Sequence, residues 1–531
     1  MILEFGTRQE LQLLVLLVTG AALLILSGPL RIPYPILLVL GGLLLGFGPG
    51  VPVVTMPPEV VLIGILPPLL YTSAYRTGLR ELRQNLRPIS LLAVGLVVVT
   101  TVGIAVVAHM VADLPWAEAF VLGAVVSPTD PIAATAIGRR YGVPRRLIDI
   151  VEGESLLNDG TALVLLRTAI VAAVSGVFSP WEAGGRLALN IVGGIAVGLA
   201  VGYVVRRVRR PLDNPPLEVT IAFLTGYFAF LPAAALGVSG VLAVVTAGVY
   251  MGWYTPELTT VQTRLQGQGF WEILTFVLNV LLFGLIGLQL RPILDGLSGR
   301  SGWSLVGEAA AVALSVIVLR FVWTFPATYV PRWLFPRIRA HDPYPPWRYP
   351  AYISWNGMRG AVTIAAALLI PLHTDSGAPL PGRELIVFFA FAVVLATLVG
   401  QGLSLPLVIR ALGLEDDGGA DAEEVQARIR AAEAALERLD ELAAESWVLD
   451  DTAARTRALY QFRIDRFSAR GDPDGDGKIE KRSLKYQRLR RELLDAERRA
   501  VVEMRNTGEI SDEVMRRVER DLDLEVSRLD A

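Results

Sequence analysis

The chain has 531 residues, of which 53% are hydrophobic and 19% are charged, and its formal net charge is −2. Soluble domains carry about 25% charged residues and are less apolar, so this composition is typical of a membrane protein and excludes an ordinary soluble domain for most of the length. The complete lack of cysteine excludes disulfide scaffolds, cysteine-ligated metals and thiol nucleophiles, and three dispersed histidines do not suggest a zinc site.

Charge divides the chain into two parts. Residues 414–531 contain 30 acidic and 22 basic side chains, a net charge of −8, which leaves +6 for residues 1–413. We therefore predict a transmembrane domain over 1–413 and a charged helical cytoplasmic domain over 414–531.

Apolar stretches long enough to cross a bilayer core of roughly 30 Å recur along the first part. They predict an all-α polytopic membrane protein with about thirteen spans. Residues 11–28 are interpreted as the first span rather than a signal peptide, because Arg8 is balanced by Glu4 and Glu10. The predicted spans are 11–28, 32–50, 59–76, 87–111, 116–138, 145–174, 185–205, 214–230, 238–253, 270–290, 303–330, 350–371 and 385–411. The weakest are the eighth and ninth, which Pro232 and Gly237 separate.

The arginines predict the orientation, because cytoplasmic loops carry an excess of positive charge. One set of alternate loops contains Arg76, Arg80, Arg83, Arg87, Arg139, Arg140, Arg145, Arg146, Arg206, Arg207, Arg209, Arg210, Arg332, Arg337, Arg339 and Arg348. The other set shows Arg186, Arg291, Arg300 and Arg383. We therefore expect the first set in the cytoplasm, the N-terminus outside and the charged tail inside.

The tail has helical periodicity in stretches such as 421–445 and 481–505, with opposite charges three or four residues apart. A solvated helical domain explains this pattern. Within it, Asp472, Asp474 and Asp476 resemble the first half of an EF-hand calcium loop, although Ser483 stands where the loop needs a bidentate Glu. A weak Ca²⁺ site and an Asp/Gly-rich turn between helices are both open.

Two predicted spans contain signals that interrupt a helix. In the fifth span, Pro128 and Pro131 flank Thr129 and Asp130, so the chain should unwind there. In the twelfth span, the glycines of 357–360 enclose Arg359. Broken helices at corresponding places in two halves of a chain indicate an inverted-repeat transporter, whose two interrupted helices cross near the membrane midplane. The alternative for the fifth span is a proline kink without a ligand.

The sixth span carries an unusual density of polar residues. At helical spacing Ser155 and Asp159 share one face, as do Glu154 and Asn158. A carboxylate, a hydroxyl and the freed carbonyls of the fifth span are hard oxygen ligands, which suit a small alkali cation. Burial favours the protonated form of Asp159, so this carboxylate could hold a proton or a cation in turn. The alternative is that these residues pair among themselves for helix packing.

Glu154 needs a cationic partner, and Arg320 in the eleventh span is the best placed by depth, with Arg359 second. Removing one member of a buried ion pair leaves an uncompensated charge. We therefore predict a structural role for Glu154.

Three segments together carry a family resemblance: Ser127-Pro128-Thr129-Asp130-Pro131, Gly153-Glu154-Ser155-Leu156-Leu157-Asn158-Asp159-Gly160 and Gly357-Met358-Arg359-Gly360-Ala361. They resemble the signature segments of NhaP-type sodium/proton antiporters, which are related to the animal sodium/proton exchangers. Leu66-Pro67-Pro68-Leu69-Leu70-Tyr71 in the third span is similar to a further family segment. Many relatives have an acid after that double proline, where this chain has Thr72 and Ser73, so a third-carboxylate or pH-sensing role is in doubt.

The resemblance, which covers roughly residues 1 to 412, implies a homodimer whose protomers each have a dimerisation domain and a mobile six-helix core. It implies ion exchange through Asp159, with Asp130, Thr129 and Ser155 around the ion. Asn158 is implied to support the unwound segment, and Glu154 to pair with Arg320. Electroneutral members have Asn before the essential Asp, so Asn158 suggests one cation per proton.

We therefore predict a secondary transporter, not an enzyme, that exchanges Na⁺ or Li⁺ for H⁺ across a prokaryotic inner membrane and serves pH homeostasis. Membrane lipid and a second copy of the chain are its expected partners, and no cofactor or nucleic acid is expected. A K⁺/H⁺ antiporter of the same fold is the alternative. A cation channel would need a continuous polar pore, and an intramembrane hydrolase a nucleophile and base in reach, which His109 and His373 near span ends do not supply.

Overall fold

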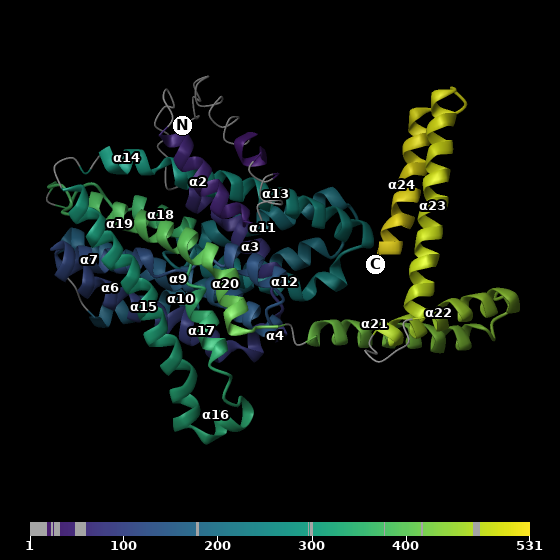
Figure 1. Cartoon of the computed structure of the whole chain (residues 1–531), viewed down its shortest axis with the longest axis horizontal. Helices are drawn as coiled ribbons and strands as arrows, with labels where there is room; N and C mark the ends of the chain where they lie inside the picture. Colours follow the sequence, from purple (N-terminus) through teal and green to yellow (C-terminus); the bar gives the residue numbers. More distant parts are fainter. Residues whose placement is uncertain are drawn as a thin grey trace. The chain divides into compact units, whose positions relative to one another are not determined.

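The computed structural model describes residues 18–22, 25, 32–47, 60–176, 180–295, 297, 301–375, 377–415, 418–470 and 478–530. Within these ranges the protein is built of helices, and the β-type pairing is limited to an isolated bridge between His373 and Pro379. Figure 1 shows the helices packed around one another, with the helices of the tail at the end of the chain. The predicted all-α class is confirmed.

Two compact units make up the chain, Met1–Glu415 and Asp416–Ala531. The boundary lies two residues after the predicted one at Gly413. Leu414 is 6% exposed and belongs to the hydrophobic core of the first unit, so the unit extends past the glycine that ends its last helix.

The elements of the first unit are α2 (Tyr34–Gly46), η1 (Val60–Ile65), α3 (Leu66–Arg76), α4 (Leu79–Gln84), α5 (Leu86–Ser90), η2 (Leu91–Leu96), α6 (Val97–Ala112), α7 (Trp116–Val126), α8 (Ile132–Arg140), α9 (Arg145–Ser175), α10 (Pro180–Arg209), α11 (Pro215–Ala235), α12 (Gly240–Leu258), α13 (Val261–Leu288), α14 (Leu290–Asp295), α15 (Gly302–Leu334), α16 (Pro336–His341), α17 (Arg348–Trp355), α18 (Ala361–Leu368), α19 (Arg383–Leu395), η3 (Ala396–Gln401) and α20 (Gly402–Leu412). The three η elements are π-helical.

Seven of the described helical segments are long and apolar enough to cross a membrane: Leu86–Ala112, Arg145–Ser175, Gly184–Arg209, Pro215–Ala235, Val261–Leu288, Gly302–Leu334 and Arg383–Leu412. Helix also occupies the other predicted spans from the second onward, partly as shorter apolar pieces. The first predicted span, 11–28, falls mostly outside the described residues, although 18–22 are helical.

Local sequence explains where many helices begin and end. Asn214, Ser239 and Thr260 each accept a hydrogen bond from a backbone N–H of the first turn of α11, α12 and α13. Pro232 does not separate the eighth and ninth spans, because α11 continues through it to Ala235, and the turn forms at Gly237 with φ of 72°. A left-handed residue of this kind is a common helix terminator.

Two large hydrophobic cores account for most of the buried apolar side chains among the described residues of the first unit. One joins residues of α6, α7, α9, α15, α17, α18 and α19 with α2 and the end of α13. The other joins α3, α10, α11 and α12 with the middle of α13. Helix α9, which carries four of the eight predicted site residues, contacts both α7 of the first group and α10 and α12 of the second.

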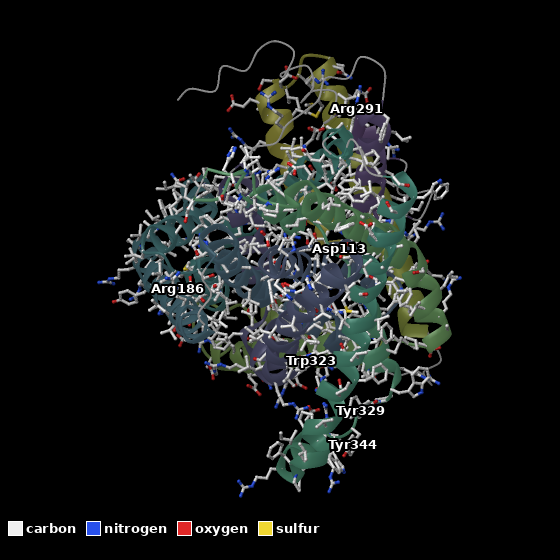
Figure 2. All side chains as sticks on the ribbon, turned by 90° about the vertical axis from the view of Figure 1, so that its left-hand side faces the viewer. Asp113, Arg186, Arg291, Trp323, Tyr329 and Tyr344 are labelled. Atoms are coloured by element: carbon white, nitrogen blue, oxygen red, sulfur yellow. The ribbon has the colours of Figure 1, made fainter. Side chains whose placement is uncertain are left out.

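Helix α15 is longer than a bilayer core is thick. Its 33 residues are about 50 Å long, against a bilayer core of roughly 30 Å. Figure 2 shows Trp323, Tyr329 and Tyr344 following one another toward the end of this projection, on the side of the unit opposite Arg291. The rings of Tyr329 and Tyr344 stack at 6.2 Å, and the Tyr329 hydroxyl donates to the Pro345 carbonyl at 3.2 Å. The segment after α16 is thereby held against α15.

The second unit contains α21 (Gly419–Leu442), α22 (Asp450–Arg470), α23 (Lys478–Asn506) and α24 (Asp512–Asp530). Helix α21 packs on α22, and α23 packs on α24. Ion pairs such as Arg490–Glu525 at 2.6 Å cross the second pair of helices. The suggested Ca²⁺ loop at Asp472, Asp474 and Asp476 lies outside the described residues.

Candidate functional site

Two interrupted helices meet inside the first unit. Helix α7 ends at Val126 and α8 begins at Ile132, while α17 ends at Trp355 and α18 begins at Ala361. The backbone N–H of Asp130 donates to the Met358 carbonyl at 2.8 Å, so the two unwound segments lie against each other. The prediction of two crossing broken helices is confirmed.

Asp130 lies at the N-terminal ends of both half-helices. Its carboxylate accepts the backbone N–H of Ile132 at 3.0 Å and also that of Ala361, the first residues of α8 and α18. Unpaired N–H groups give a helix N-terminus a partial positive charge, which a carboxylate stabilises. A Cβ at Gly360 would stand 2.0 Å from Asp130 Oδ2, so the close approach of the two segments requires glycine at this position.

Two fully buried arginines cover the opposite helix ends. Arg359 Nε donates to the Val126 carbonyl at the end of α7, and Arg320 Nε donates to the Ile353 carbonyl near the end of α17, both at 3.0 Å. Both side chains are 0% exposed. Cations are favourable at helix C-termini for the same reason that anions are favourable at N-termini. All four helix ends at the crossing are thus matched by a charge of opposite sign.

A chain of hydrogen bonds connects α15, α9 and the first unwound segment. Arg320 binds Glu154 in a bidentate pair, with N–O distances of 2.5 and 2.7 Å. The Thr129 hydroxyl donates to Glu154 Oε1 at 3.1 Å and accepts from the Asn158 amide nitrogen at 2.8 Å. Since an ionised carboxylate can only accept, the single Thr129 proton must point at Glu154, and Asn158 must therefore present its NH₂. The network fixes the orientation of each member.

Ser155 and Asp159 lie on the other face of this part of α9. The Ser155 hydroxyl donates to the Thr129 carbonyl at 2.9 Å, which leaves its oxygen lone pairs free to bind a cation. Asp159, one turn further, is 5% exposed and near enough to Asp130 for their charges to interact. Among the described residues, Asn158 Oδ1 has no hydrogen-bond partner. Buried oxygens of carboxylate, hydroxyl, amide and carbonyl type are therefore gathered here, which is the ligand set of a hard cation.

The structure brings all of the predicted site residues into one region. Thr129, Asp130, Glu154, Ser155, Asn158, Asp159, Arg320 and Arg359 all lie at the crossing or directly beside it. The sequence analysis missed Thr397, whose hydroxyl accepts from the Arg359 backbone N–H at 3.0 Å and which is 0% exposed. A lone threonine in the apolar last span gave little signal for this role.

Comparisons with known proteins agree with this geometry. The profile of the family described as "Sodium/hydrogen exchanger, transmembrane" matches residues 13–411. A protein named as an uncharacterized Na⁺/H⁺ exchanger of Mycobacterium tuberculosis is 36% identical over 531 residues, which cover 99% of this chain and 97% of the relative. A Bacillus pumilus protein named as a sodium, potassium, lithium and rubidium/H⁺ antiporter is 32% identical, over 71% of this chain and 58% of the relative.

Solved structures show the same fold. The sodium/proton antiporter MjNhaP1 of Methanocaldococcus jannaschii superposes with a TM-score of 0.60 at 19% identity, over 76% of this chain and 97% of that one.

Proposed function

The chain belongs to the sodium/hydrogen exchanger family, a family of cation/proton antiporters rather than enzymes, and we propose that it exchanges Na⁺ or Li⁺ for H⁺ by competition of the two ions for Asp159. The observation that carries the proposal is the burial of Asp159 next to the crossing, beside oxygens of Ser155 and the unwound segment. A buried carboxylate without a fixed cationic partner needs either a metal ion or a proton, and it cannot hold both.

We assign Thr129, Ser155 and Asp130 to the cation site, where each has a different role. Ser155 and the Thr129 carbonyl offer oxygens that a dehydrated cation can bind. Asp130 contributes its charge from a position where two helix N-termini already hold its carboxylate. Its first role is to keep the crossing together while the cation is absent. Glu154, Arg320 and Arg359 support the site without binding the ion, because their charges are already paired or directed at helix ends.

Asn158 supports a stoichiometry of one cation per proton. Its amide donates to Thr129, and it carries no proton that could be exchanged. With Asp159 as the one exchangeable carboxylate, each cycle would carry one positive charge in each direction and produce no net current.

K⁺/H⁺ exchange is the second candidate. The Bacillus pumilus relative is named for sodium, potassium, lithium and rubidium, and hydroxyl, carboxylate and carbonyl oxygens also bind K⁺. The ion preference depends on the size of the site when occupied, which ion competition measures directly.

Flux measurements on the purified full chain test the proposal. In proteoliposomes with an imposed pH gradient, addition of Na⁺ or Li⁺ should collapse the gradient, and K⁺ should do so only if the second candidate holds. Asp159→Asn keeps the shape of the side chain and should abolish the response while folding is retained. Asp149→Asn on the same helix, ten residues before Asp159, is the matched control and should exchange normally. Sodium-dependent proton flux in Asp159→Asn would refute the competition mechanism.

The remaining assignments follow from the family resemblance and from charge. We propose a homodimer in a prokaryotic inner membrane, with the N-terminus outside and the acidic tail in the cytoplasm, acting in pH homeostasis. Few residues of α10 are buried inside the protomer, which supports a helix that faces lipid or a second protomer. A Ca²⁺ site at Asp472, Asp474 and Asp476 stays a separate proposal, which calcium titration of the full chain tests.

A further inference from the structure

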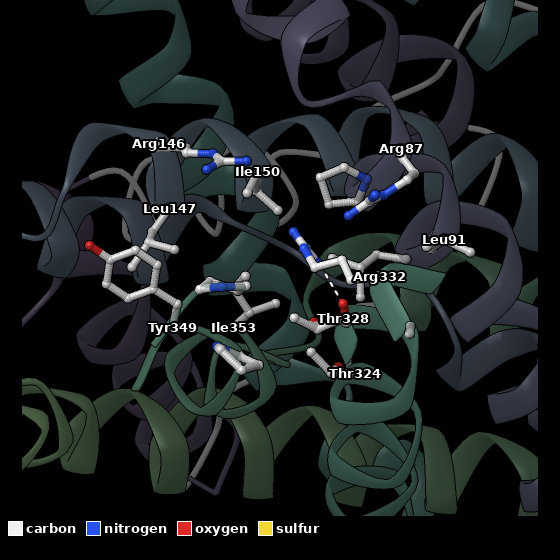
Figure 3. Close-up of a pocket in the computed structure, with 15 residues that line it drawn as sticks. Arg87, Leu91, Arg146, Leu147, Ile150, Thr324, Thr328, Arg332, Tyr349 and Ile353 are labelled. Carbon is white, nitrogen blue, oxygen red and sulfur yellow. Dashed lines mark hydrogen bonds between the residues drawn. The ribbon is translucent and has the colours of Figure 1, made fainter. Parts of the chain in front are cut away.

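A small cavity lies between five elements at the end of the first unit where predicted cytoplasmic arginines gather. Its volume is about 50 Å³, and its lining comes from α5 and η2, from the start of α9, from the second half of α15, and from α17 with the residues before it. A cavity needs at least about 10 Å³ for each water-sized group that it holds, so this cavity is large enough for a small polyatomic ion. Figure 3 shows the labelled lining residues, with Arg332 bonded to Thr328.

The lining is cationic. It includes Arg87, Arg146 and Arg332, two threonines, and otherwise apolar, tyrosine or proline residues, and none of the lining residues is acidic. All three guanidinium groups reach one carboxylate outside the lining, that of Asp342. The N–O distances are 2.9 Å from Arg87, 3.1 Å from Arg146 and 2.7 Å from Arg332.

One carboxylate does not neutralise three arginines. Burial alone would raise the pKa of Asp342, but hydrogen bonds from Arg146 and Arg332 and their positive charges outweigh burial and lower the pKa below its ordinary value. Asp342 is therefore ionised at neutral pH, and the cluster retains two positive charges. Arg332, with a side chain 5% exposed, holds one of the three charges away from water.

Two buried polar atoms at the cavity also lack partners among the described residues. These are Arg87 Nε and the hydroxyl oxygen of Thr324, a residue that is only 2% exposed. Buried polar groups without partners are uncommon in native proteins, because leaving their hydrogen bonds unmade costs free energy. Here both lie on the lining of a cationic cavity, so an anion with several acceptor oxygens would complete their bonding.

We propose that this cavity binds a phosphate group, with Arg87, Arg146 and Arg332 supplying charge and Thr324 supplying a hydroxyl. Guanidinium forks match the geometry of phosphate oxygens, and a site lined by arginines near the ends of apolar helices could take the phosphate either of a free anion or of an anionic lipid headgroup.

A phosphate bound in this cavity would contact helices that also carry residues of the candidate ion site. Helix α9 carries Asp159 and Glu154, α15 carries Arg320, and α17 leads into the second unwound segment. Ile353 lines the cavity, and its carbonyl accepts from Arg320. A bound phosphate would join these elements one to three helical turns from the Glu154–Arg320 ion pair, and should stabilise the packing of α9, α15 and α17 around the crossing.

Thermal unfolding of the purified full chain tests the proposal and separates the two sources of phosphate. In non-ionic detergent, Tm is measured with inorganic phosphate against chloride at equal ionic strength. In nanodiscs, Tm is measured in phosphatidylcholine with and without phosphatidylglycerol. Arg87→Gln should weaken the apparent affinity about tenfold, because it removes one charge-assisted contact. Thr324→Val keeps the volume and all three arginines, and should reduce the stabilisation by less.

Arg145→Gln is the matched control, because Arg145 neighbours Arg146 but lies near Glu81 at 3.9 Å and does not line the cavity. Stabilisation by free phosphate that is weakened in Arg87→Gln and Thr324→Val but kept in Arg145→Gln supports a free-anion site. The same pattern with phosphatidylglycerol alone supports a headgroup site. No stabilisation by either probe, or an equal effect in all variants, overturns the proposal. If Arg87→Gln fails to fold, Thr324→Val decides the outcome. None of these readings depends on the exchange activity.

Discussion

The pair formed by Glu154 and Arg320 offers the sharpest test of how the site is held together. The two side chains are 1% and 0% exposed, and their bidentate contact has N–O distances of 2.5 and 2.7 Å. Glu154 also receives the Thr129 hydroxyl, and Arg320 also donates to the Ile353 carbonyl. Replacing Glu154 by alanine leaves Arg320 as a buried charge without its carboxylate, and replacing Arg320 leaves Glu154 with the electrostatic attraction of Arg359 but without its bidentate ion pair.

The expected cost follows from that burial. Removing one member of a fully buried pair costs about 3–5 kcal/mol, of which much is the penalty of the abandoned charge. For a unit of this size that free energy corresponds to a fall in Tm of roughly 3–6 °C. Arg320→Ala should be the more damaging of the two, because it also leaves the Ile353 carbonyl without its donor. The double variant abandons no charge, so it should lose at least about 2 kcal/mol less than the sum of the single losses.

The assay is the Tm of each purified variant, with yield and cation-dependent proton flux measured in parallel. Glu152→Ala serves as the control on the same helix, since Glu152 pairs at 2.7 Å with Arg139, which is 68% exposed. That exposed pair should contribute less than about 1 kcal/mol. Additive losses for Glu154→Ala and Arg320→Ala would refute the reasoning, and a larger change in cation affinity than in stability would move Glu154 into the ion site.

Three further predictions follow from other parts of the chain. If exchange is one to one because Asn158 is uncharged, an imposed membrane potential should hardly change the rate, and a clear current on adding Na⁺ would show that a second group carries a proton. Because the pKa of Asp342 is lowered from 3.8, its ion pairs should stabilise the protein above about pH 4 and lose this effect below it, so the Tm deficit of Asp342→Asn should be constant between about pH 8 and pH 5 and shrink in more acidic buffer. A deficit that grew on acidification would contradict that assignment. A truncation after Glu415 should retain exchange with a changed pH profile, because the crossing lies wholly within the first unit, whereas the removed residues 416–531 carry −7 and should attract the arginines predicted to be cytoplasmic over roughly 8 Å. A folded truncation without exchange at any pH would make the tail part of the transport machinery.

The breaks in the two crossing helices could be predicted from sequence, because their causes are local. Pro128 and Pro131 remove backbone donors within one turn, and the glycines around Arg359 weaken the helix at that point. The polar residues of α9 could also be predicted as site residues, because charged and amide side chains are rare in apolar spans. In the structure α7 ends two residues before Pro128, and α17 ends two residues before Gly357.

Contacts between distant segments gave no comparable signal. The positive-inside pattern treats Arg87, Arg146 and Arg332 alike as loop charges. In the structure all three pair with Asp342, which no local pattern distinguishes from other loop acids. Arg209 was counted in the same way. It is 2% exposed and pairs with the fully buried Glu218 across the turn between α10 and α11. Positive charge near a span end therefore predicts topology without revealing which arginines are structural.

In the hydrogen-bond chain from Arg320 to Asn158, the Thr129 hydroxyl proton connects the stability of the buried ion pair with the proposed number of protons exchanged. Thr129 has a single hydroxyl hydrogen, and Glu154 needs it, so whatever stands at position 158 must donate to Thr129. An ionised aspartate there could only accept, and it would place a second negative charge beside Glu154. Such a side chain would have to carry its own proton whenever the Glu154–Arg320 pair is intact. A chain with Asn at this position satisfies the same bond permanently, without a titratable group, and we infer that this leaves Asp159 as the carboxylate whose charge changes during the cycle.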